Sequence, residues 1–398
     1  MSLELAKKVL QIAPSATLGM ISKINELKAQ GKDIIAFNVG EPDFNTADHI
    51  NKAMYAAVEA GHTKYVNVSG IESLRKAISE KFLKDNNLNY EINQILVSTG
   101  AKQTIYNALL TICNPDDEVI IPTPCWVSYE ELVKLSDGKC VFVPTKADFQ
   151  LDLEAIEKAL SPKTKAIIIT SPNNPTGCVY QQEDLIKLAN LALKYEFYIL
   201  ADEIYEKLLY DGKKHLSIAS LSDDIYQQTI TINGFAKTYA MTGHRIGYAG
   251  YPSAEMAKRA ANIQAHTTAN STSFVQYAAL EALESKQDFV SEMVVEFEKR
   301  RNLSFALLDE IPNIKYSKVS GAFYIMIDVS YYFNKEYNGT LIKDSDDLVI
   351  YLLEEGQIAL VGGKSFQAPN FVRFSYSNSQ ENIIEGLKRM KEALLKLQ

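Results

Sequence analysis

The sequence predicts an α/β protein with a large domain built on a mostly parallel sheet and a smaller α+β domain. Two observations lead to this fold class. From about Thr46 to about Glu284, short continuous apolar runs alternate with segments of helical period. That alternation indicates parallel strands that are buried on both faces by helices. After Ser285, long charged helices come first and strands follow, which is typical of a separate α+β unit.

The large domain is therefore predicted over residues 46–284. Its strands are expected at the short apolar runs Ile95–Ser98, Val119–Ile121, Val141–Val143, Ala166–Thr170, Tyr198–Ala201 and Thr229–Ile232. Between most of them the apolar residues recur at helical spacing, which predicts helices over Ala101–Ile112, Trp126–Leu135, Leu153–Leu160 and Glu183–Lys194.

The small domain is predicted to combine both chain ends, residues 1–45 and 285–398. Its strands are expected at Ala322–Ile327, Gln357–Val361 and Phe371–Ser375, and a helix runs from Glu381 to the end. The extended segment Ile34–Val39 is expected to pack on these elements.

Composition narrows the class of protein. Lys and Arg total 41 against 49 Asp and Glu, so the net charge is −8. This acidic balance argues against nucleic acid as a partner. No apolar run approaches the roughly 18 residues that a membrane span needs, and no signal peptide is evident, so we expect a cytoplasmic protein without a membrane partner. The five histidines show no metal-binding spacing and no obvious carboxylate companions, so no metal is expected.

Polar residues follow four of the predicted strands. A turn of small residues, Thr99–Lys102, follows the strand predicted at Ile95–Ser98. The rigid loop Ser171–Gly177, which contains Asn174, follows the strand predicted at Ala166–Thr170. Asp202 follows another strand, with Tyr205 three residues later, and Lys237 and Arg245 follow the last, at Thr229–Ile232. Because parallel sheets bind ligands at the carboxyl ends of their strands, we expect these groups to converge.

This set of groups suits pyridoxal phosphate. A lysine forms a Schiff base with its aldehyde, and a carboxylate keeps its ring nitrogen protonated. A phenol or an amide bonds the ring hydroxyl, while helix N–H groups and an arginine hold the phosphate. Taken singly, each residue has a simpler interpretation as a helix cap, a turn or a surface charge; their joint order along one sheet favours the cofactor.

In this order, the segments resemble the class I/II aminotransferases of the fold-type I pyridoxal-phosphate enzymes, nearest to the bacterial aspartate and aromatic aminotransferase branch. The resemblance covers essentially the whole chain and implies a seven-stranded type of sheet. The matching motifs are Pro14-Ser-Ala-Thr17, Asn38-Val-Gly-Glu-Pro-Asp-Phe44, Lys64-Tyr65, Gly100-Ala-Lys102, Trp126-Val-Ser-Tyr129, Ser171-Pro-Asn-Asn-Pro-Thr-Gly177, Asp202-Glu-Ile-Tyr205, Lys237 with Arg245, and Arg373.

The resemblance implies a role for each residue around the cofactor ring. Lys237 would form the Schiff base and then shuttle the proton between the substrate and the cofactor. Asp202 would pair with the ring nitrogen, Tyr205 and Asn174 would bond the ring hydroxyl, and Trp126 would stack on the ring face.

It also implies how the phosphate and the substrate are held. Gly100, Ala101, Lys102 and Arg245 would bind the phosphate, together with Tyr65 from the neighbouring subunit of a homodimer. Arg373 would grip the substrate α-carboxylate bidentately, assisted by the Gly40 backbone, Asn174 and Trp126.

The function expected is ping-pong transamination between an L-amino acid, first of all aspartate, and 2-oxoglutarate. Several relatives bind dicarboxylates with an added lysine on the helix after the phosphate turn, and Leu109-Leu-Thr111 offers no cation there. An aromatic or broad-specificity aminotransferase therefore stays open, as does a carbon–sulfur β-lyase. Thr17 and Cys125 are further positions that could shape specificity.

Overall fold

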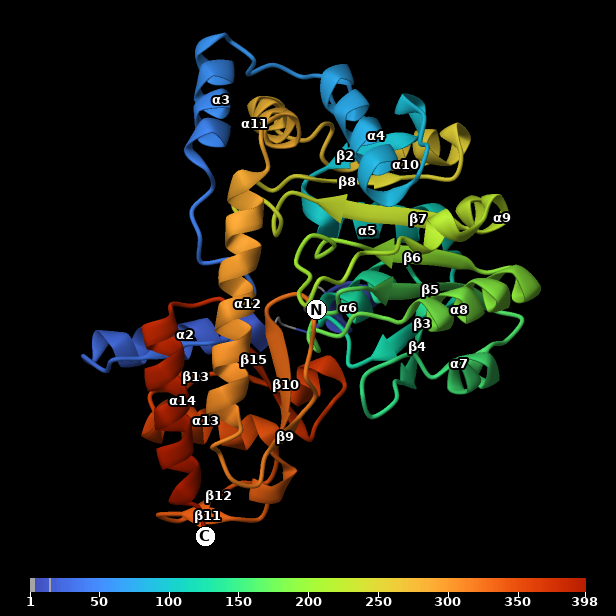
Figure 1. Cartoon of the computed structure of the whole chain (residues 1–398). Helices are drawn as coiled ribbons and strands as arrows, with labels where there is room; N and C mark the ends of the chain where they lie inside the picture. Colours follow the sequence, from blue (N-terminus) through green and yellow to red (C-terminus); the bar gives the residue numbers. More distant parts are fainter. Residues whose placement is uncertain (1–3, 14–15) are drawn as a thin grey trace.

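Within residues 4–13 and 16–398, which the computed structural model describes, the largest sheet has seven strands in the order β2-β8-β7-β6-β5-β3-β4 (Figure 1). β8 is antiparallel to both of its neighbours, and every other neighbouring pair is parallel. The predicted α/β class with a mostly parallel seven-stranded sheet is thus confirmed. The strands are β2 (Ile95–Ser98), β3 (Glu118–Thr123), β4 (Lys139–Pro144), β5 (Thr164–Thr170), β6 (Tyr198–Asp202), β7 (Thr229–Gly234) and β8 (Gly247–Gly250).

Each apolar run expected to form a strand in this sheet lies within one of its strands, but β8 was missed. Its sequence, Gly-Tyr-Ala-Gly, has no β-branched residue and so gives no strand signal. The structure needs glycine there because other groups come close. A Cβ atom on Gly247 would lie 2.5 Å from the backbone nitrogen of Ala101, at the start of α5 (Gly100–Ile112).

Helices cover both faces of this sheet and its β2 edge. One face packs on α7, α8 and α9, the other on α5, α6 and α10, and the β2 edge on α3, α4 and α11. The bounds of these further helices are α3 (Asp48–Glu59), α4 (Glu72–Asn86), α6 (Ser128–Leu135), α7 (Leu153–Ala159), α8 (Gln182–Tyr195), α9 (Asp223–Gln227), α10 (Ala254–Thr267) and α11 (Ser273–Glu284).

The second part of the molecule is an antiparallel sheet, β14-β15-β10-β9, with α12, α13 and α14 packed around it (Figure 1). The long helix α12 runs from the region of the large sheet into this part. The bounds are α12 (Asp288–Leu308), β9 (Lys315–Tyr316), β10 (Tyr324–Asp328), α13 (Ser345–Glu355), β14 (Val361–Gly362), β15 (Phe371–Ser375) and α14 (Gln380–Leu395).

The two chain ends meet in this second part. β1 (Ile35–Ala36) pairs in parallel with β13 (Ile358–Ala359), so the extended N-terminal segment joins C-terminal elements. The single strand expected over Gln357–Val361 is instead two short strands, β13 and β14, that belong to different sheets. The division into domains 1–45 with 285–398 and 46–284 stays a prediction; its boundaries fall between β1 and α3 and at the end of α11.

The remaining elements are short or peripheral. They are α1 (Lys7–Leu10), α2 (Ala16–Ala29), β11 (Glu336–Tyr337), β12 (Thr340–Leu341), and the 3₁₀ turns Ile92–Gln94, Ile218–Leu221, Ser330–Tyr332 and Gly363–Phe366. Across the described part of the chain, none of the helices has both the length and the apolar character that crossing a membrane requires.

Candidate active site

A cavity of about 380 Å³ lies where the carboxyl ends of β5, β6 and β7 face the segment Asn38–Glu41 and β15. Ten of the twelve site residues expected from the sequence line it: Gly40, Ala101, Lys102, Trp126, Asn174, Asp202, Tyr205, Lys237, Arg245 and Arg373. The two that do not are Gly100, at the first position of α5, and Tyr65, whose side chain is 89% exposed. The order of polar groups along the sheet therefore did place most of them together.

Lys237 follows β7 and reaches across the cavity to the N-terminal segment. Its Nζ donates a hydrogen bond to the carbonyl oxygen of Gly40. Desolvation lowers the pKa of Lys237 from 10.5 to about 8; the negative charge of Glu41 opposes this, and Arg373 adds to it. The amine is therefore partly neutral near physiological pH, as a nucleophile or a base must be.

Asp202 is the last residue of β6, and its carboxyl group is buried in the cavity wall. Tyr129 Oη donates to its Oδ2 over 2.6 Å. Burial raises the pKa of Asp202 to about 6, and the hydrogen bond from Tyr129 opposes that rise. A buried acid of this kind is stabilised as a carboxylate by a cationic partner in the cavity, which is what the protonated nitrogen of a pyridine ring supplies.

The start of α5 and Arg245 form an anion niche. The Thr99 side chain makes no capping hydrogen bond, so N–H groups of the first turn stay available. Gly100 has φ +81°, and a Cβ atom on it would lie 2.6 Å from Arg245 Nη2, so the guanidinium packs directly against this turn. Free N–H groups, the helix dipole and an arginine together suit a phosphate.

Arg373, on β15, is buried and faces the cavity with part of its guanidinium unused. Nη1 donates to Asn174 Oδ1 over 3.1 Å, and Nη2 donates to the carbonyl oxygen of Asn38 over 2.9 Å. Nε has no hydrogen-bond partner among the described residues. An orphaned buried donor on a planar guanidinium fits a carboxylate that is bound as a ligand.

The aromatic residues of the cavity are held by neighbours that the sequence did not identify. The hydroxyl groups of Tyr205 and Tyr324 lie 2.9 Å apart. The rings of Trp126 and Tyr129 meet edge to face, with centroids 5.3 Å apart. Tyr324 gave no signal beyond its place in an apolar strand, and Tyr129 appeared only as part of a motif, without a role.

Lys102 places a cation on α5 at a position other than Leu109–Thr111, where the sequence offers none. Its Nζ lies 5.0 Å from the centre of the Trp126 ring and its side chain lines the cavity. Lys102 lies about two helical turns before Leu109 on α5. Cys125 is buried and does not line the cavity. Pro14 lies outside the described residues, and so does the side chain of Thr17.

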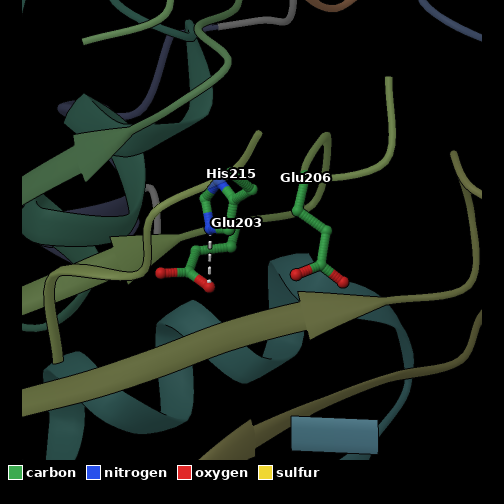
Figure 2. Close-up of side chains that lie close together, drawn as sticks. All are labelled: Glu203, Glu206 and His215. Carbon is green, nitrogen blue, oxygen red and sulfur yellow. Dashed lines mark ion pairs between the residues drawn. The ribbon is translucent and has the colours of Figure 1, made fainter. Parts of the chain in front are cut away.

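One histidine contradicts the expectation about carboxylate companions. His215 Nε2 lies 3.0 Å from a carboxylate oxygen of Glu203, and Glu206 is close by (Figure 2). No local pattern predicts this contact, because eight residues lie between Glu206 and His215 and only the fold brings them together.

Comparison with known proteins agrees with the fold. The profile of the family "Aminotransferase class I and II" matches residues 32–390. The aspartate aminotransferase of Bacillus subtilis (strain 168) is 44% identical over 391 residues, covering 98% of both chains. A probable aspartate/prephenate aminotransferase of Aquifex aeolicus (strain VF5) is 43% identical, again over 98% of both chains.

Solved structures give the same result. The aspartate aminotransferase from Rhizobium meliloti superimposes with a TM-score of 0.96 at 37% identity and covers all of both chains. That from Thermus thermophilus with maleate has a TM-score of 0.92 at 38% identity, covering 98% of this chain and 100% of its own. The fold is therefore that of the fold-type I aminotransferases.

The chain belongs to the class I and II aminotransferase family. It is an aminotransferase, and its cofactor is pyridoxal phosphate.

Proposed function

We propose that this aminotransferase transfers the amino group of aspartate to 2-oxoglutarate, in two half-reactions at the cavity described above. Among the described residues, the cationic side chains that line the cavity are those of Lys102, Lys237, Arg245 and Arg373. The observation that carries the proposal is Lys102, because the other three have roles that any amino acid substrate requires.

Lys237 is proposed as the residue that attaches the cofactor and, once released by the substrate, moves the proton at the substrate Cα. When bound, pyridoxal phosphate supplies an electron sink for the charge left by that proton. Asp202, held by Tyr129, would keep the ring nitrogen protonated. Tyr205 and Asn174 would bond the ring hydroxyl, and Trp126 would cover the ring face.

The phosphate is proposed to lie on the backbone of Gly100, Ala101 and Lys102, against Arg245. Tyr65 would add its hydroxyl from a second copy of the chain, and the exposure of its side chain in one copy supports this. We therefore infer a homodimer.

The described cysteines are all free thiols, which supports a reducing compartment such as the cytoplasm.

The substrate would be held at its α-carboxylate by Arg373, with Gly40 and Asn174 beside it. A dicarboxylate such as aspartate has a second carboxylate, and the Lys102 ammonium is the cation left to receive it. The backbone of Lys102 can serve the phosphate at the same time, since only its N–H is needed there. The names of the relatives described above support aspartate independently.

The test is a panel of single amino acids mixed with holoenzyme, with aspartate, phenylalanine and alanine compared by kcat/KM. We expect aspartate to be preferred, and Lys102→Met to lower kcat/KM for aspartate by about 10- to 100-fold through loss of one charge-assisted bond. The same variant should change kcat/KM for alanine by no more than about twofold, because that substrate has no second carboxylate.

Two controls distinguish a role of Lys102 in substrate recognition from a general effect of losing a lysine and from a role in cofactor binding. The exposed Lys194→Met changes a lysine outside the cavity and should leave every substrate unaffected. The cofactor dissociation constant of Lys102→Met should stay close to wild type. Preference of the wild-type enzyme for phenylalanine would instead indicate an aromatic aminotransferase, and release of pyruvate from cystathionine without an oxo acid would indicate a β-lyase.

A further inference from the structure

The turn that carries Asp202 and Tyr205 has a second set of side chains on its other side. Glu203 and Glu206 alternate with the two cavity residues in sequence and do not line the cavity. Both are buried, with 3% and 4% of their surface exposed, and both lie near His215 (Figure 2). Two buried carboxylates need strong partners, so their contacts show what holds this turn.

The Glu203 carboxylate accepts two hydrogen bonds and lies close to a histidine. Ser217 Oγ donates to its Oε1 over 2.6 Å, and Asn86 Nδ2 donates to its Oε2 over 3.1 Å. His215 Nε2 lies 3.0 Å from the same Oε2. The backbone N–H of Glu203 also donates to the carbonyl oxygen of Ile232 on β7 over 2.8 Å.

Glu206 is tied to α4. Lys81 forms an ion pair with its carboxylate, and Asn86 Nδ2 donates to its Oε2 over 2.7 Å. Lys81 Nζ also donates to Asn86 Oδ1 over 2.7 Å. Asn86 thus bridges both glutamates and the lysine, and one helix holds the turn at two places.

The ligand atoms of Glu203, Glu206 and His215 lie within 4.8 Å of one another, a spacing that would suit a metal ion. Lys81 already supplies a cation to this cluster, and a divalent ion would have to displace it. The proximity of Lys81 and His215 lowers the pKa of Glu206 to about 2, against the effect of burial, so this carboxylate stays charged. Lys81 therefore serves as the cation of this cluster.

We propose that Lys81, Asn86, Glu203, Glu206 and His215 are positioning residues that set the placement of Asp202 and Tyr205 toward the cofactor. The inference rests on the proposed roles of those two residues. Its physical basis is that residues lining the cavity alternate along this turn with residues that do not. The backbone that presents positions 202 and 205 to the cavity is anchored on the opposite side through the side chains at positions 203 and 206. A small displacement of a positioned group is costly for binding and catalysis.

The test uses Glu206→Gln and the double variant Lys81→Met with Glu206→Gln. The single variant leaves the Lys81 ammonium buried without its main counter-ion, which should lower stability. The double variant removes both charges and should restore the urea midpoint toward wild type. If the network positions the turn, cofactor affinity should fall about 10-fold in both variants and stay low in the double variant.

Three measurements on the purified holoenzyme are needed: the urea midpoint, the cofactor dissociation constant, and the pH midpoint of the visible absorbance of the bound cofactor. Glu157→Gln, in the exposed ion pair with Lys194, is the matched Glu-to-Gln control and should change none of them. Leu353→Ala, in a separate core cluster, is the control for lost stability and should lower the urea midpoint alone.

The proposal would be overturned if cofactor affinity and absorbance changed in parallel with the urea midpoint in every variant, including Leu353→Ala. Wild-type affinity in both network variants would overturn it too. None of these readouts requires an amino donor, so a failure of the proposed aspartate specificity leaves this test unaffected.

Discussion

Burial shifts the pKa values of Lys237 and Asp202, the two residues proposed to act on the cofactor ring. Desolvation lowers the pKa of Lys237 and raises that of Asp202, so each is shifted toward neutral pH from opposite directions. The two shifts have different consequences. A neutral amine is useful as a nucleophile and base. The role proposed for Asp202 needs a carboxylate, and the hydrogen bond from Tyr129 favours that charged form.

The first prediction concerns Lys237. Only the neutral amine attacks an aldehyde, so the rate of cofactor attachment to the cofactor-free chain should rise with pH and level off above about pH 8. With a lysine of ordinary pKa, the rate of attachment would continue to rise until about pH 10.4. Because the charge of Glu41 raises the pKa of Lys237, Glu41→Gln should move the midpoint to lower pH. Stopped-flow absorbance measures both, and a midpoint near pH 10 would contradict the burial argument.

At the scale of elements, the site depends on short turns that follow strands. The turn from β2 into α5 is shaped by Gly100, whose positive φ and missing side chain leave room for Arg245. The last turn, after β7, brings Lys237, and β8 then returns antiparallel beside β7 with glycine at its tightest contact. The polar residues after apolar runs predicted these turns. Strand β8 was not predicted, because its glycines are there to allow close contact and carry no strand pattern.

Gly100→Ala tests this packing. A methyl group there would displace Arg245 and also strain the backbone at φ +81°, so we expect cofactor affinity to fall by about 10-fold or more. Gly243→Ala is the matched control, because Gly243 lies two residues before Arg245 and has nothing within 4 Å of an added Cβ atom. Equal cofactor affinity of the two variants in equilibrium titration would show that Arg245 does not need this space.

At the scale of the whole molecule, one copy of the chain brings ten of the twelve expected site residues to one cavity. Arg373 from the C-terminal part and Gly40 from the N-terminal part face Lys237 and Asp202 of the large sheet. Of the two expected residues that do not line the cavity, Gly100 lies at the start of α5, whereas Tyr65 is exposed. If it serves a neighbouring subunit, the functional unit is a dimer with shared sites.

Subunit mixing tests this sharing. In a hybrid of Tyr65→Ala and Lys237→Ala chains, one site receives both defects and the other receives neither. Random reassociation of equal amounts should therefore yield about one quarter of wild-type activity, above that of either parent. Activity no higher than the average of the two parents, with hybrid formation verified by native mass spectrometry, would place Tyr65 outside the neighbouring site.

The sequence by itself determined the α/β class, six strands of the large sheet, and the polar residues that gather at their ends. It could do so because strand period, helix period and turn chemistry are local properties. Contacts between distant segments were decided only by the tertiary structure. They are the hydrogen bond from Tyr129 to Asp202, the position of Lys102 over the Trp126 ring, and the cluster of His215 with Glu203 and Glu206. Such contacts join residues that no local pattern relates, because packing of the whole chain sets the distance between them.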